Sequence, residues 1–404
     1  MKLLLVSPHF PTLDVFQRRS DDPRSKFLYD YAVEWAKQGH QVTILHTIPK
    51  YPRVFQAAIQ LGGRWSNRIW SAYARFLQPS RTVEFADYNA NGIRVVRIPV
   101  SKYIPHRDVS PWAVRALMRN VEVALPVTPR SADIILADYV SPSLAVAAAF
   151  KARANIPFFQ IFHRSDIPYV RRSAGIRRRL SGAAGFVYRS NPLRAALEAD
   201  TLTDGKRALY MYSGIPDDIS LGGIRNRVRR LLYVGTLRHS KNVQDVIRAL
   251  SAPDLRATCS LDVVGDGPYR DQLVKMARTL GLGEIVAFHG AKPRDEVFGM
   301  MRRADALVMV SRETFGMVYV EAMSQGCIVV AARGEGIDGI VKDGHNGILV
   351  SPDAHNSLVA ALRALVNLPE RAVEAMSEQA LATAASLRNS ALAAALLDEM
   401  IRSI

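Results

Sequence analysis

Short apolar runs that read as buried strands alternate with helical segments along nearly the whole 404-residue chain, and this alternation limits the fold more than any other feature. Strands separated by helices return parallel to one another, with helices covering both faces of the sheet. A chain of this length fits two domains of about 150–200 residues each. We therefore predict an α/β protein with two Rossmann-like, doubly wound parallel-sheet domains.

Strands are predicted where runs rich in Val, Ile and Leu lie between turn residues. In the first half they are Lys2–Ser7, Gln41–His46, Ile93–Pro99, Asp133–Ala137, Pro157–Phe162 and Ala184–Arg189. In the second half they are Arg230–Val234, Leu261–Val264, Ile285–Phe288, Ala306–Val310, Ile328–Ala331 and Ile348–Val350. Helical periodicity predicts helices at Ser25–Gln38, Tyr269–Leu280, Arg294–Arg303 and Asn356–Val366.

The segment Asp217–Arg230 is rich in glycine and then basic, and it lacks clear periodicity, as is typical of a linker. We accordingly place an N-terminal domain at 1–216, a linker at 217–229 and a C-terminal domain at 230–385. Residues 386–404 are expected to form a helix that packs back on the N-terminal domain.

The composition excludes several classes of protein. With 49% hydrophobic and 22% charged residues the chain is globular rather than disordered. No stretch approaches the ~18 apolar residues of a membrane span, and the apolar run within 1–8 is too short for a signal peptide. The two cysteines, Cys259 and Cys327, lack metal-ligand spacing and are expected to be packed thiols in a reducing compartment.

The net charge of +16 is concentrated in the first half of the chain. Residues 1–200 hold 29 Lys and Arg against 14 Asp and Glu, whereas 201–404 are almost balanced. A domain with a field of one sign attracts a polyanion, such as anionic lipid, lipid phosphate or nucleic acid. A solubilising charge without a partner is the alternative.

Two basic stretches of the first half are candidates for that contact. In the irregular stretch Lys50–Asp87, aromatic side chains such as Trp65 and Trp70 lie among arginines, which suits either a membrane interface or an ordinary core helix. The second stretch, 171–179, contains five arginines and reads either as a phosphate-docking patch or as a solvated helix face.

The most informative segment is 306–326, which reads as a buried strand, a short loop and a helix beginning near Gly316 and ending at Gly326. In open α/β sheets, ligands bind beyond the carboxyl ends of the strands. The free N–H groups of the helix start favour an anion such as a diphosphate, and Gly316 allows close approach of the backbone. Glu313 and Glu321 provide carboxylates there that can accept hydrogen bonds from sugar or ribose hydroxyls.

Glu313 and Glu321, with seven residues between them, resemble the E-x7-E motif of retaining glycosyltransferases of family 4, which have the GT-B fold with two domains facing across a cleft. The resemblance extends over about 230–365. It includes the glycine turn 264–268, the F-x-G segment 288–290 and the segments 334–341 and 343–347.

The resemblance implies a role for each matching residue. Glu313 would orient the donor sugar and Lys241 would pair with the diphosphate, so that both are counted as catalytic together with His163, while Glu321 would hold the nucleotide ribose. The remaining donor-binding residues are glycines, backbone donors and loop side chains: Gly235, Thr236, Arg238, Gly265, Phe315, Gly316 and Met317. The family often has arginine where this chain has Thr236, and Arg238 is the candidate to replace it.

His163 follows a predicted strand and resembles the family histidine near the anomeric carbon, although a structural histidine is the ordinary alternative. Asp166 lies beside it, and Asp138 ends another strand as a candidate acceptor base or an ordinary loop carboxylate. Many family members carry a Gly-Gly loop after the first strand, where this chain has a basic stretch that includes Arg24 and Lys26. The acceptor-binding candidates are therefore Arg24, Lys26, Asp138 and Asp166.

The resemblance predicts transfer of a sugar from a nucleotide-diphosphate sugar to an acceptor hydroxyl, with retention, without a metal and without a further cofactor. Together with the basic first half it predicts a lipid-linked or glycan acceptor of bacterial exopolysaccharide, capsule or O-antigen synthesis, and a cytoplasmic enzyme peripheral to the anionic inner membrane face. A nucleotide-sugar epimerase of the same fold and a basic nucleic-acid-binding protein are the rivals. The second predicts salt-dependent oligonucleotide binding and leaves the paired glutamates unexplained, so no nucleic-acid partner is expected.

Overall fold

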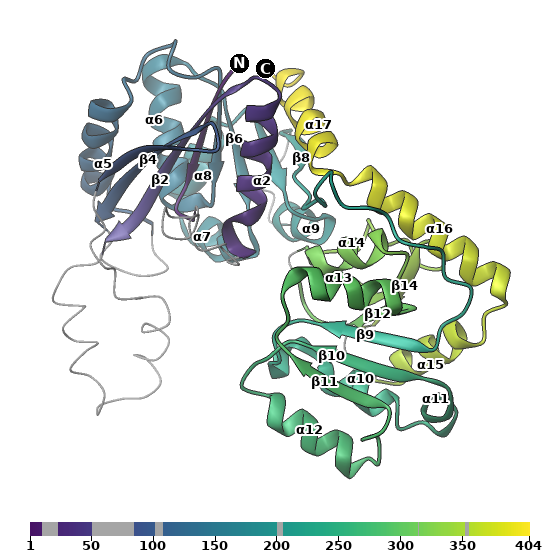
Figure 1. The fold of residues 1–404 in the computed structure, drawn as a ribbon. Helices are drawn as coiled ribbons and strands as arrows, with labels where there is room; N and C mark the ends of the chain where they lie inside the picture. Colours follow the sequence, from purple (N-terminus) through teal and green to yellow (C-terminus); the bar gives the residue numbers. More distant parts are fainter. Residues whose placement is uncertain (10–22, 51–84, 102–107, 200–204, 314, 352–354) are drawn as a thin grey trace, which may run out of the picture. The chain divides into compact units, whose positions relative to one another are not determined.

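Residues 1–9, 23–50, 85–101, 108–199, 205–313, 315–351 and 355–404 are described by the computed structural model (Figure 1). The chain divides into two units. Unit 1 comprises 1–188, 196–211 and 393–404, and unit 2 comprises 189–195 and 212–392. Within unit 1 the indole N–H of Trp35 donates to the carbonyl of Ala393 over 2.8 Å, so that a hydrogen bond joins the helix Asn389–Ile401 to the helix Pro23–Lys37.

Unit 1 is built on an eight-stranded sheet in the order β3-β4-β2-β1-β5-β6-β7-β8, parallel except for the β3–β4 pair. Its strands are β1 (Lys2–Ser7), β2 (Gln41–Lys50), β3 (Ala86–Ala90), β4 (Ile93–Ser101), β5 (Ile134–Asp138), β6 (Phe158–Phe162), β7 (Gly185–Tyr188) and β8 (Arg207–Tyr210). All six strands predicted in this half are confirmed to within a few residues at their ends.

Two strands of unit 1, β3 and β8, were not among the predicted ones. The predicted irregular stretch Lys50–Asp87 was too long at both ends, because Lys50 ends β2 and 86–87 begin β3. Residues 51–84, with Trp65 and Trp70, lie outside the described residues. The turn between β3 and β4 is Asn91-Gly92, and both residues have positive φ, at 51° and 78°. An Asn-Gly pair of this kind is a strong local signal for a two-residue hairpin.

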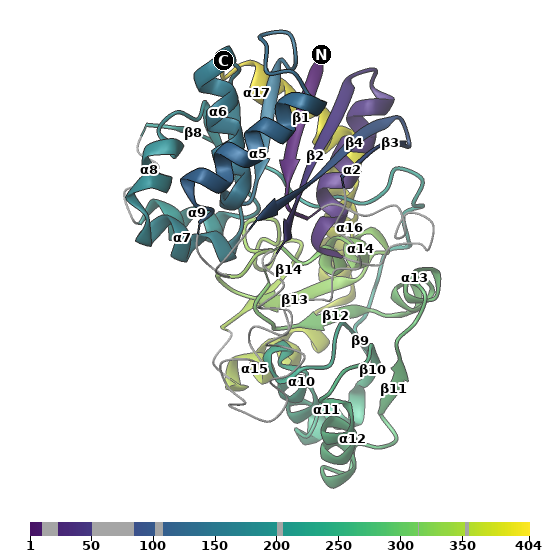
Figure 2. The same ribbon diagram turned by 90° about the vertical axis from the view of Figure 1, so that its left-hand side faces the viewer.

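Helices cover both faces of the first sheet (Figures 1 and 2), with α5 and α6 on one face and α2 and α17 on the other. Phe27, Tyr31 and Trp35 of α2 are buried, as their four-residue spacing predicts. The helices of this part are α2 (Pro23–Lys37), α5 (Pro111–Ala124), α6 (Ala145–Ala154), α7 (Ile167–Arg172), α8 (Ala174–Leu180), α9 (Asn191–Glu198) and α17 (Asn389–Ile401).

Unit 2 has a six-stranded, wholly parallel sheet in the order β11-β10-β9-β12-β13-β14. Its strands are β9 (Arg230–Val234), β10 (Ser260–Val264), β11 (Val286–Gly290), β12 (Ala306–Met309), β13 (Ile328–Ala332) and β14 (Gly347–Val350). Its helices are α10 (Val243–Ala249), α11 (Pro253–Thr258), α12 (Arg270–Thr279), α13 (Arg294–Arg303), α14 (Met317–Ser324), α15 (His355–Val366) and α16 (Glu370–Ser386). All six strands predicted in this half are confirmed, and two doubly wound parallel sheets are the observed fold class.

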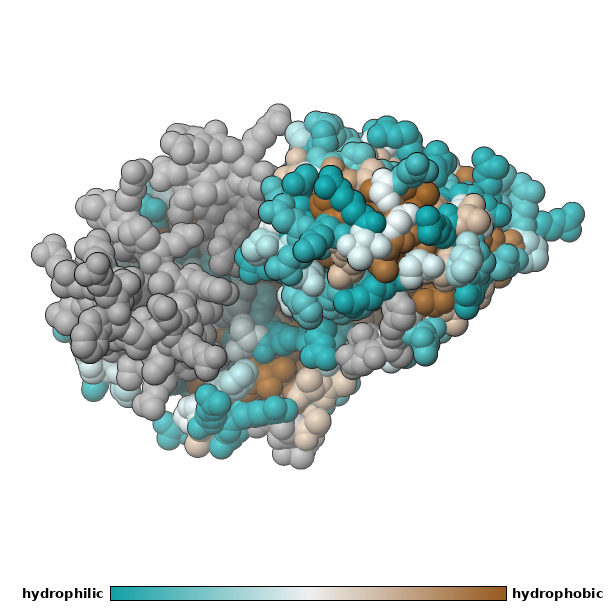
Figure 3. Space-filling model, turned by 90° about the horizontal axis from the view of Figure 1, so that it is seen from below, coloured by the Kyte–Doolittle hydropathy of each residue, from teal (hydrophilic) through white to brown (hydrophobic). Residues whose placement is uncertain are grey.

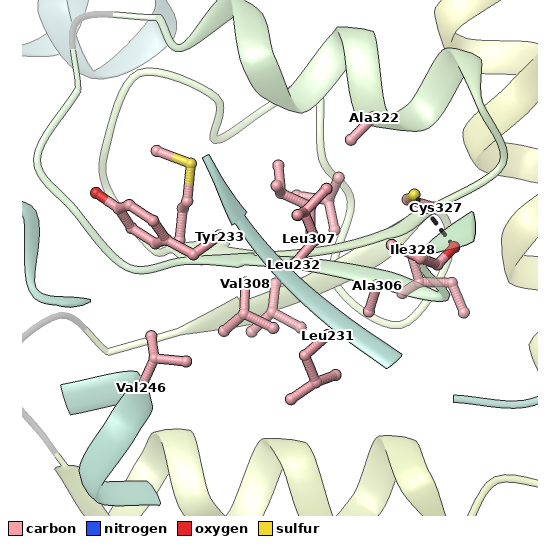
Figure 4. Close-up of a cluster of buried hydrophobic side chains, with 14 of the residues drawn as sticks. Leu231, Leu232, Tyr233, Val246, Ala306, Leu307, Val308, Ala322, Cys327 and Ile328 are labelled. Carbon is pink, nitrogen blue, oxygen red and sulfur yellow. Dashed lines mark hydrogen bonds between the residues drawn. The ribbon is translucent and has the colours of Figure 1, made fainter. Parts of the chain in front are cut away.

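The core of unit 2 lies on both sides of its sheet. Figure 4 shows Val246 of α10 on one side of the central strands and Ala322 of α14 on the other. Leu231, Leu232 and Leu307 between them are 1% exposed or less. Burial of both faces explains why these strands read as continuous apolar runs rather than as alternating ones.

Arg225, in the segment predicted as a linker, is 9% exposed and packs into unit 2. Its guanidinium donates to the carbonyls of Met301, Arg302 and Ala304 at the end of α13 and to that of Gln325 after α14. Cationic groups satisfy the last carbonyls of a helix, which have no partner within it. The segment therefore fixes the ends of two helices of unit 2.

The surface of the described residues is mixed in polarity. On the face drawn in Figure 3, hydrophilic residues surround small groups of hydrophobic ones. Among the described helices none is long and apolar enough to cross a membrane.

The loops after β9 and β10 touch backbone to backbone in unit 2. Gly235 N donates to the Val264 carbonyl over 2.9 Å, and Leu237 N donates to that of Asp266 over 3.0 Å. Gly265 has φ 137°, and a Cβ at this position would lie 1.9 Å from the carbonyl oxygen of Gly235. Only glycine fits this contact, which fixes the loop that begins at Gly235.

We predict that Gly265→Ala lowers the free energy of unfolding by about 3 kcal/mol or more, because the added methyl group must displace a backbone carbonyl. Chemical denaturation measures this loss. Gly283→Ala is the control, since a Cβ at 283 meets nothing within 4 Å and its expected change is below about 1 kcal/mol. Equal stability of the two variants would contradict the contact.

Candidate functional site

Glu313 lies in the loop that follows β12, at the carboxyl edge of the sheet of unit 2. Its carboxylate accepts a hydrogen bond from the Ser311 hydroxyl over 2.9 Å and forms an ion pair with the ammonium group of Lys241. Lys241 belongs to a short 3-10 turn, His239–Lys241, that follows the Gly235 loop. The structure thus brings together the two residues of unit 2 that the sequence analysis counted as catalytic.

A buried tyrosine, Tyr233, lies near the Lys241–Glu313 pair. Tyr233, on β9, is fully buried. Burial raises the pKa of its hydroxyl most, and the negative charge of Glu313 raises this pKa further. Within the part of the chain that the structure describes, this hydroxyl has no hydrogen-bond partner. Tyr319, on α14, is also buried and donates to the Met309 carbonyl over 2.9 Å. Both phenols remain neutral near pH 7 beneath a charged surface pair.

Gly316 marks the start of α14, as the sequence predicted. It has φ 87°, and a Cβ there would lie 2.4 Å from the ring of Tyr319, so that glycine is required on both counts. Met317 is the first residue of the helix, and the N–H groups of a first helical turn have no partner within the helix. This terminus is positively polarised and suits an anionic ligand.

Phe315 is held in place from two sides. Its ring packs against that of Tyr212 at 5.6 Å between centroids, and the guanidinium carbon of Arg189 lies 6.0 Å from its centre. Arg189 is 5% exposed and donates to the Ser213 hydroxyl over 2.5 Å. The sequence analysis missed Arg189, which ends a strand-like run of the first half, and no local motif marks its contact with a residue 126 positions away.

Glu321 forms a separate pair on α14. One of its oxygens accepts a hydrogen bond from Arg294 over 2.7 Å, and its side chain is 14% exposed. Arg294 begins α13, and its guanidinium carbon also lies 5.4 Å from the Phe298 ring. Arg294 is the second residue near the predicted donor site that the sequence analysis missed, because nothing in its own helix distinguishes it from a surface arginine.

The Gly235 loop carries two exposed polar residues, Thr236 and Arg238. The Arg238 side chain has no ion pair or hydrogen bond to any residue that the structure describes. The close backbone contact of Gly265 with Gly235 fixes this loop. The predicted donor-binding residues therefore occupy one edge of the unit 2 sheet, with Glu313 and Lys241 in direct contact.

In unit 1 a buried hydrogen-bond chain joins the ends of three adjacent strands. Asp138, at the end of β5, is 1% exposed. One of its oxygens lies 2.7 Å from His163 Nε2, and the other accepts a hydrogen bond from the Ser7 hydroxyl over 2.7 Å. The structure thus places the predicted residues His163 and Asp138 together.

Asp166 is the second buried carboxylate of this hydrogen-bond network in unit 1. It accepts hydrogen bonds from the backbone N–H groups of His163, over 2.8 Å, and Val140, over 3.2 Å. Burial raises the pKa of Asp166 to about 6, while the neighbouring His163 and these two N–H groups act in the opposite direction. Its carboxylate ties the loop after β5 to the loop after β6.

Arg24 and Lys26 lie in the first turn of α2, and their assignment to acceptor binding stays a prediction. Within the described ranges, no group of three or more His, Cys, Asp or Glu side chains is placed to hold a metal ion. Cys259 and Cys327 are buried free thiols, and burial raises the pKa of each.

Comparison with known proteins identifies the class that this fold and edge site define. A family model described as a glycosyl transferase 4-like domain matches residues 25–211, and a model described as glycosyl transferases group 1 matches residues 217–382. The two units have the Rossmann-like α/β folds of GT-B proteins. The chain belongs to the glycosyltransferases of the GT-B fold.

Three similar proteins illustrate the range of this class. Glycogen synthase of Mycobacterium tuberculosis is 35% identical over 146 residues, which are 35% of each chain, so that the match spans about a third of that relative. The structure of a lipopolysaccharide outer core galactosyltransferase, WaaB, covers 100% of this chain and 99% of its own, with a TM-score of 0.67 and 15% identity. Anabaena HepE in complex with UDP-glucose covers 100% of both chains, with a TM-score of 0.60 and 17% identity.

The raised pKa of Asp166 predicts a pH-dependent contribution to stability. Because its pKa in the folded protein, about 6, lies above the ordinary value of 3.8, folding favours the protonated form. This contribution is complete below about pH 4 and is lost as the pH rises through 6. Relative to Asp166→Asn, the free energy of unfolding of the wild type should fall by roughly 1 kcal/mol between pH 5 and pH 7.5.

Denaturant melts of both proteins at each pH provide the measurement. Asp271→Asn is the control, since the Asp271 side chain is 99% exposed and its difference from the wild type should be independent of pH in this range. A constant difference for Asp166→Asn as well would contradict the raised pKa.

Proposed function

We propose that the protein transfers a sugar, with retention of anomeric configuration and without a metal ion, from a nucleotide-diphosphate sugar to an acceptor hydroxyl. The observation that carries the proposal is the Lys241–Glu313 pair beside the start of α14. A cation, a carboxylate and a set of free backbone N–H groups lie there within one loop cluster at the carboxyl edge of a parallel sheet. Acidic and basic groups in that arrangement suit a ligand that is anionic at one end and rich in hydroxyls at the other.

In the proposed mechanism the donor diphosphate approaches the start of α14 and Lys241. The ammonium group then stabilises the negative charge that develops on the departing phosphate, which is the role a metal ion has in other transferases. Glu313 exchanges part of its contact with Lys241 for hydrogen bonds from hydroxyls of the donor sugar. The nucleotide ribose binds at Glu321, where one carboxylate oxygen is held by Arg294 and the other remains for a hydroxyl.

The HepE structure supports the choice of donor class, because that GT-B protein was observed with UDP-glucose. For the acceptor we propose a lipid-linked or other glycan of polysaccharide synthesis, reached at an anionic membrane surface on the inner side of the cell membrane. The basic stretch of unit 1 supports this part, since Arg172 in α7 and Arg178 in α8 have exposed side chains. Each such cation near an anionic surface contributes about 1 kcal/mol.

We predict that Glu313→Gln lowers the rate of sugar transfer about 100-fold or more, because the amide cannot match a carboxylate as a hydrogen-bond acceptor in the transition state. The donor is first chosen as the UDP-, GDP-, ADP- or dTDP-sugar that raises the melting temperature most. Transfer is then measured as release of the nucleoside diphosphate in the presence of acceptor. Glu378→Gln, an exposed change on α16, should leave the rate unaltered.

Two results count against the proposed function. The first is a panel in which no nucleotide sugar shifts the melting temperature or binds in calorimetry. The second is undiminished transfer by Glu313→Gln.

The membrane part has its own test. We predict that Arg172→Ser with Arg178→Ser weakens binding to vesicles rich in phosphatidylglycerol at low salt by about 30-fold, measured by co-sedimentation. The matched control is Lys275→Ser with Arg278→Ser, which removes two exposed charges from α12 of unit 2 and should weaken binding less than twofold. Equal weakening by both pairs would indicate an effect of net charge alone.

A further inference from the structure

The hydrogen-bond chain of unit 1 bears on the role of Asp138, for which the sequence left two alternatives open, an acceptor base and an ordinary loop carboxylate. A base that deprotonates an acceptor must reach the hydroxyl of that acceptor with a carboxylate oxygen. Asp138 is 1% exposed, and its two oxygens are engaged by His163 and Ser7. In this geometry it contacts the His163 ring rather than an incoming ligand.

Two aromatic rings contact the His163 ring, in addition to the contact between its Nε2 and Asp138. The Tyr139 ring stacks on it at 3.8 Å between centroids and 7° between planes, and the Phe27 ring lies at 5.5 Å. A small part of the histidine stays accessible, with 10% of its side chain exposed. The imidazole is thus held in position by contacts on several sides.

Tyr139 reaches this stack from an unusual backbone conformation. Its φ is 60° with ψ 148°, a region that costs a non-glycine residue about 1–3 kcal/mol. The next residue, Val140, donates its backbone N–H to Asp166, and the same carboxylate accepts the N–H of His163. Asp166 therefore joins the two loops whose side chains stack on each other, and its two bonds help to hold the strained conformation.

We propose that Asp138 is a positioning residue for His163, with Asp166 and the Tyr139 ring fixing the same imidazole. The role resembles that of carboxylates that hold a catalytic imidazole in one tautomer and one orientation in other enzymes. The kinetic test of this role rests on the proposed function, whereas the positioning does not.

Proton NMR of the whole protein with ¹⁵N-labelled histidine tests the positioning directly. We expect a downfield imidazole N–H signal, because a hydrogen bond to a buried carboxylate is strong and protected from solvent exchange. The signal should be absent from His163→Gln and should move upfield in Asp138→Asn, where a neutral amide is the acceptor. A His163 signal that is unchanged in Asp138→Asn would overturn the proposal.

A double-mutant cycle on kcat/KM tests whether Asp138 acts through His163. Asp138→Asn should lower kcat/KM about tenfold in the wild-type background and less than twofold in His163→Gln, because the residue that it positions is then missing. Effects that multiply would mean that Asp138 acts independently, as a base or otherwise, and would overturn the proposal. If Asp138→Asn does not fold, Ser7→Ala removes the other hydrogen bond of Asp138, and its smaller loss should vanish in the same way.

The outcomes separate the two proposals. A protein that transfers no sugar but shows the downfield signal retains the positioning and loses the proposed function. A protein that transfers sugar but shows multiplying effects retains the function and loses the positioning.

Discussion

The parallel arrangement of strands is the constraint on which both units depend. Because every crossover in unit 2 returns the chain to the same end of the sheet, all six strands finish along one edge, and the faces are closed by helices. Charged side chains are uncommon on strands that are buried on both faces. They collect in the loops just beyond the strand ends, which explains why Glu313, Lys241, Asp138 and His163 all lie within a few residues of a strand end or of its loop.

Each of these charges is compensated by a neighbour within its own unit. Glu313 meets Lys241, Glu321 meets Arg294 and Asp138 meets His163. Removal of a charge from water is costly unless a partner of opposite sign or a hydrogen-bond donor replaces the lost solvent. The contrast is between the partly exposed ion pairs of unit 2 and the buried hydrogen-bond chain of unit 1.

Much of this architecture could be predicted from the sequence, because strands buried on both faces leave a signal that is local. The twelve predicted strands were found, and the break at Gly316 was placed correctly because an apolar strand, a loop and a glycine stand next to one another in the chain. The β3–β4 hairpin was not predicted although Asn91-Gly92 is a strong hairpin signal, because no helix separates β3 from β4 and the α/β alternation is interrupted there. The segment predicted as a linker contains Arg225, whose five backbone carbonyl partners lie up to 100 residues away.

The roles of the site residues stay predictions, and the contacts between these residues could not be predicted from local sequence patterns. Lys241 and Glu313 are 72 residues apart, and Ser7 and Asp138 are 131 residues apart.

The contact between Trp35 and Ala393 has a consequence for the order in which the protein is completed. Unit 1 begins with the first strand of the chain and yet includes residues 393–404, which are synthesised only after the whole of unit 2. The Trp35 indole N–H therefore acquires its carbonyl partner only after the chain has grown by a further 358 residues, and until then water is its hydrogen-bond partner. Unit 2 has every residue it needs before unit 1 does.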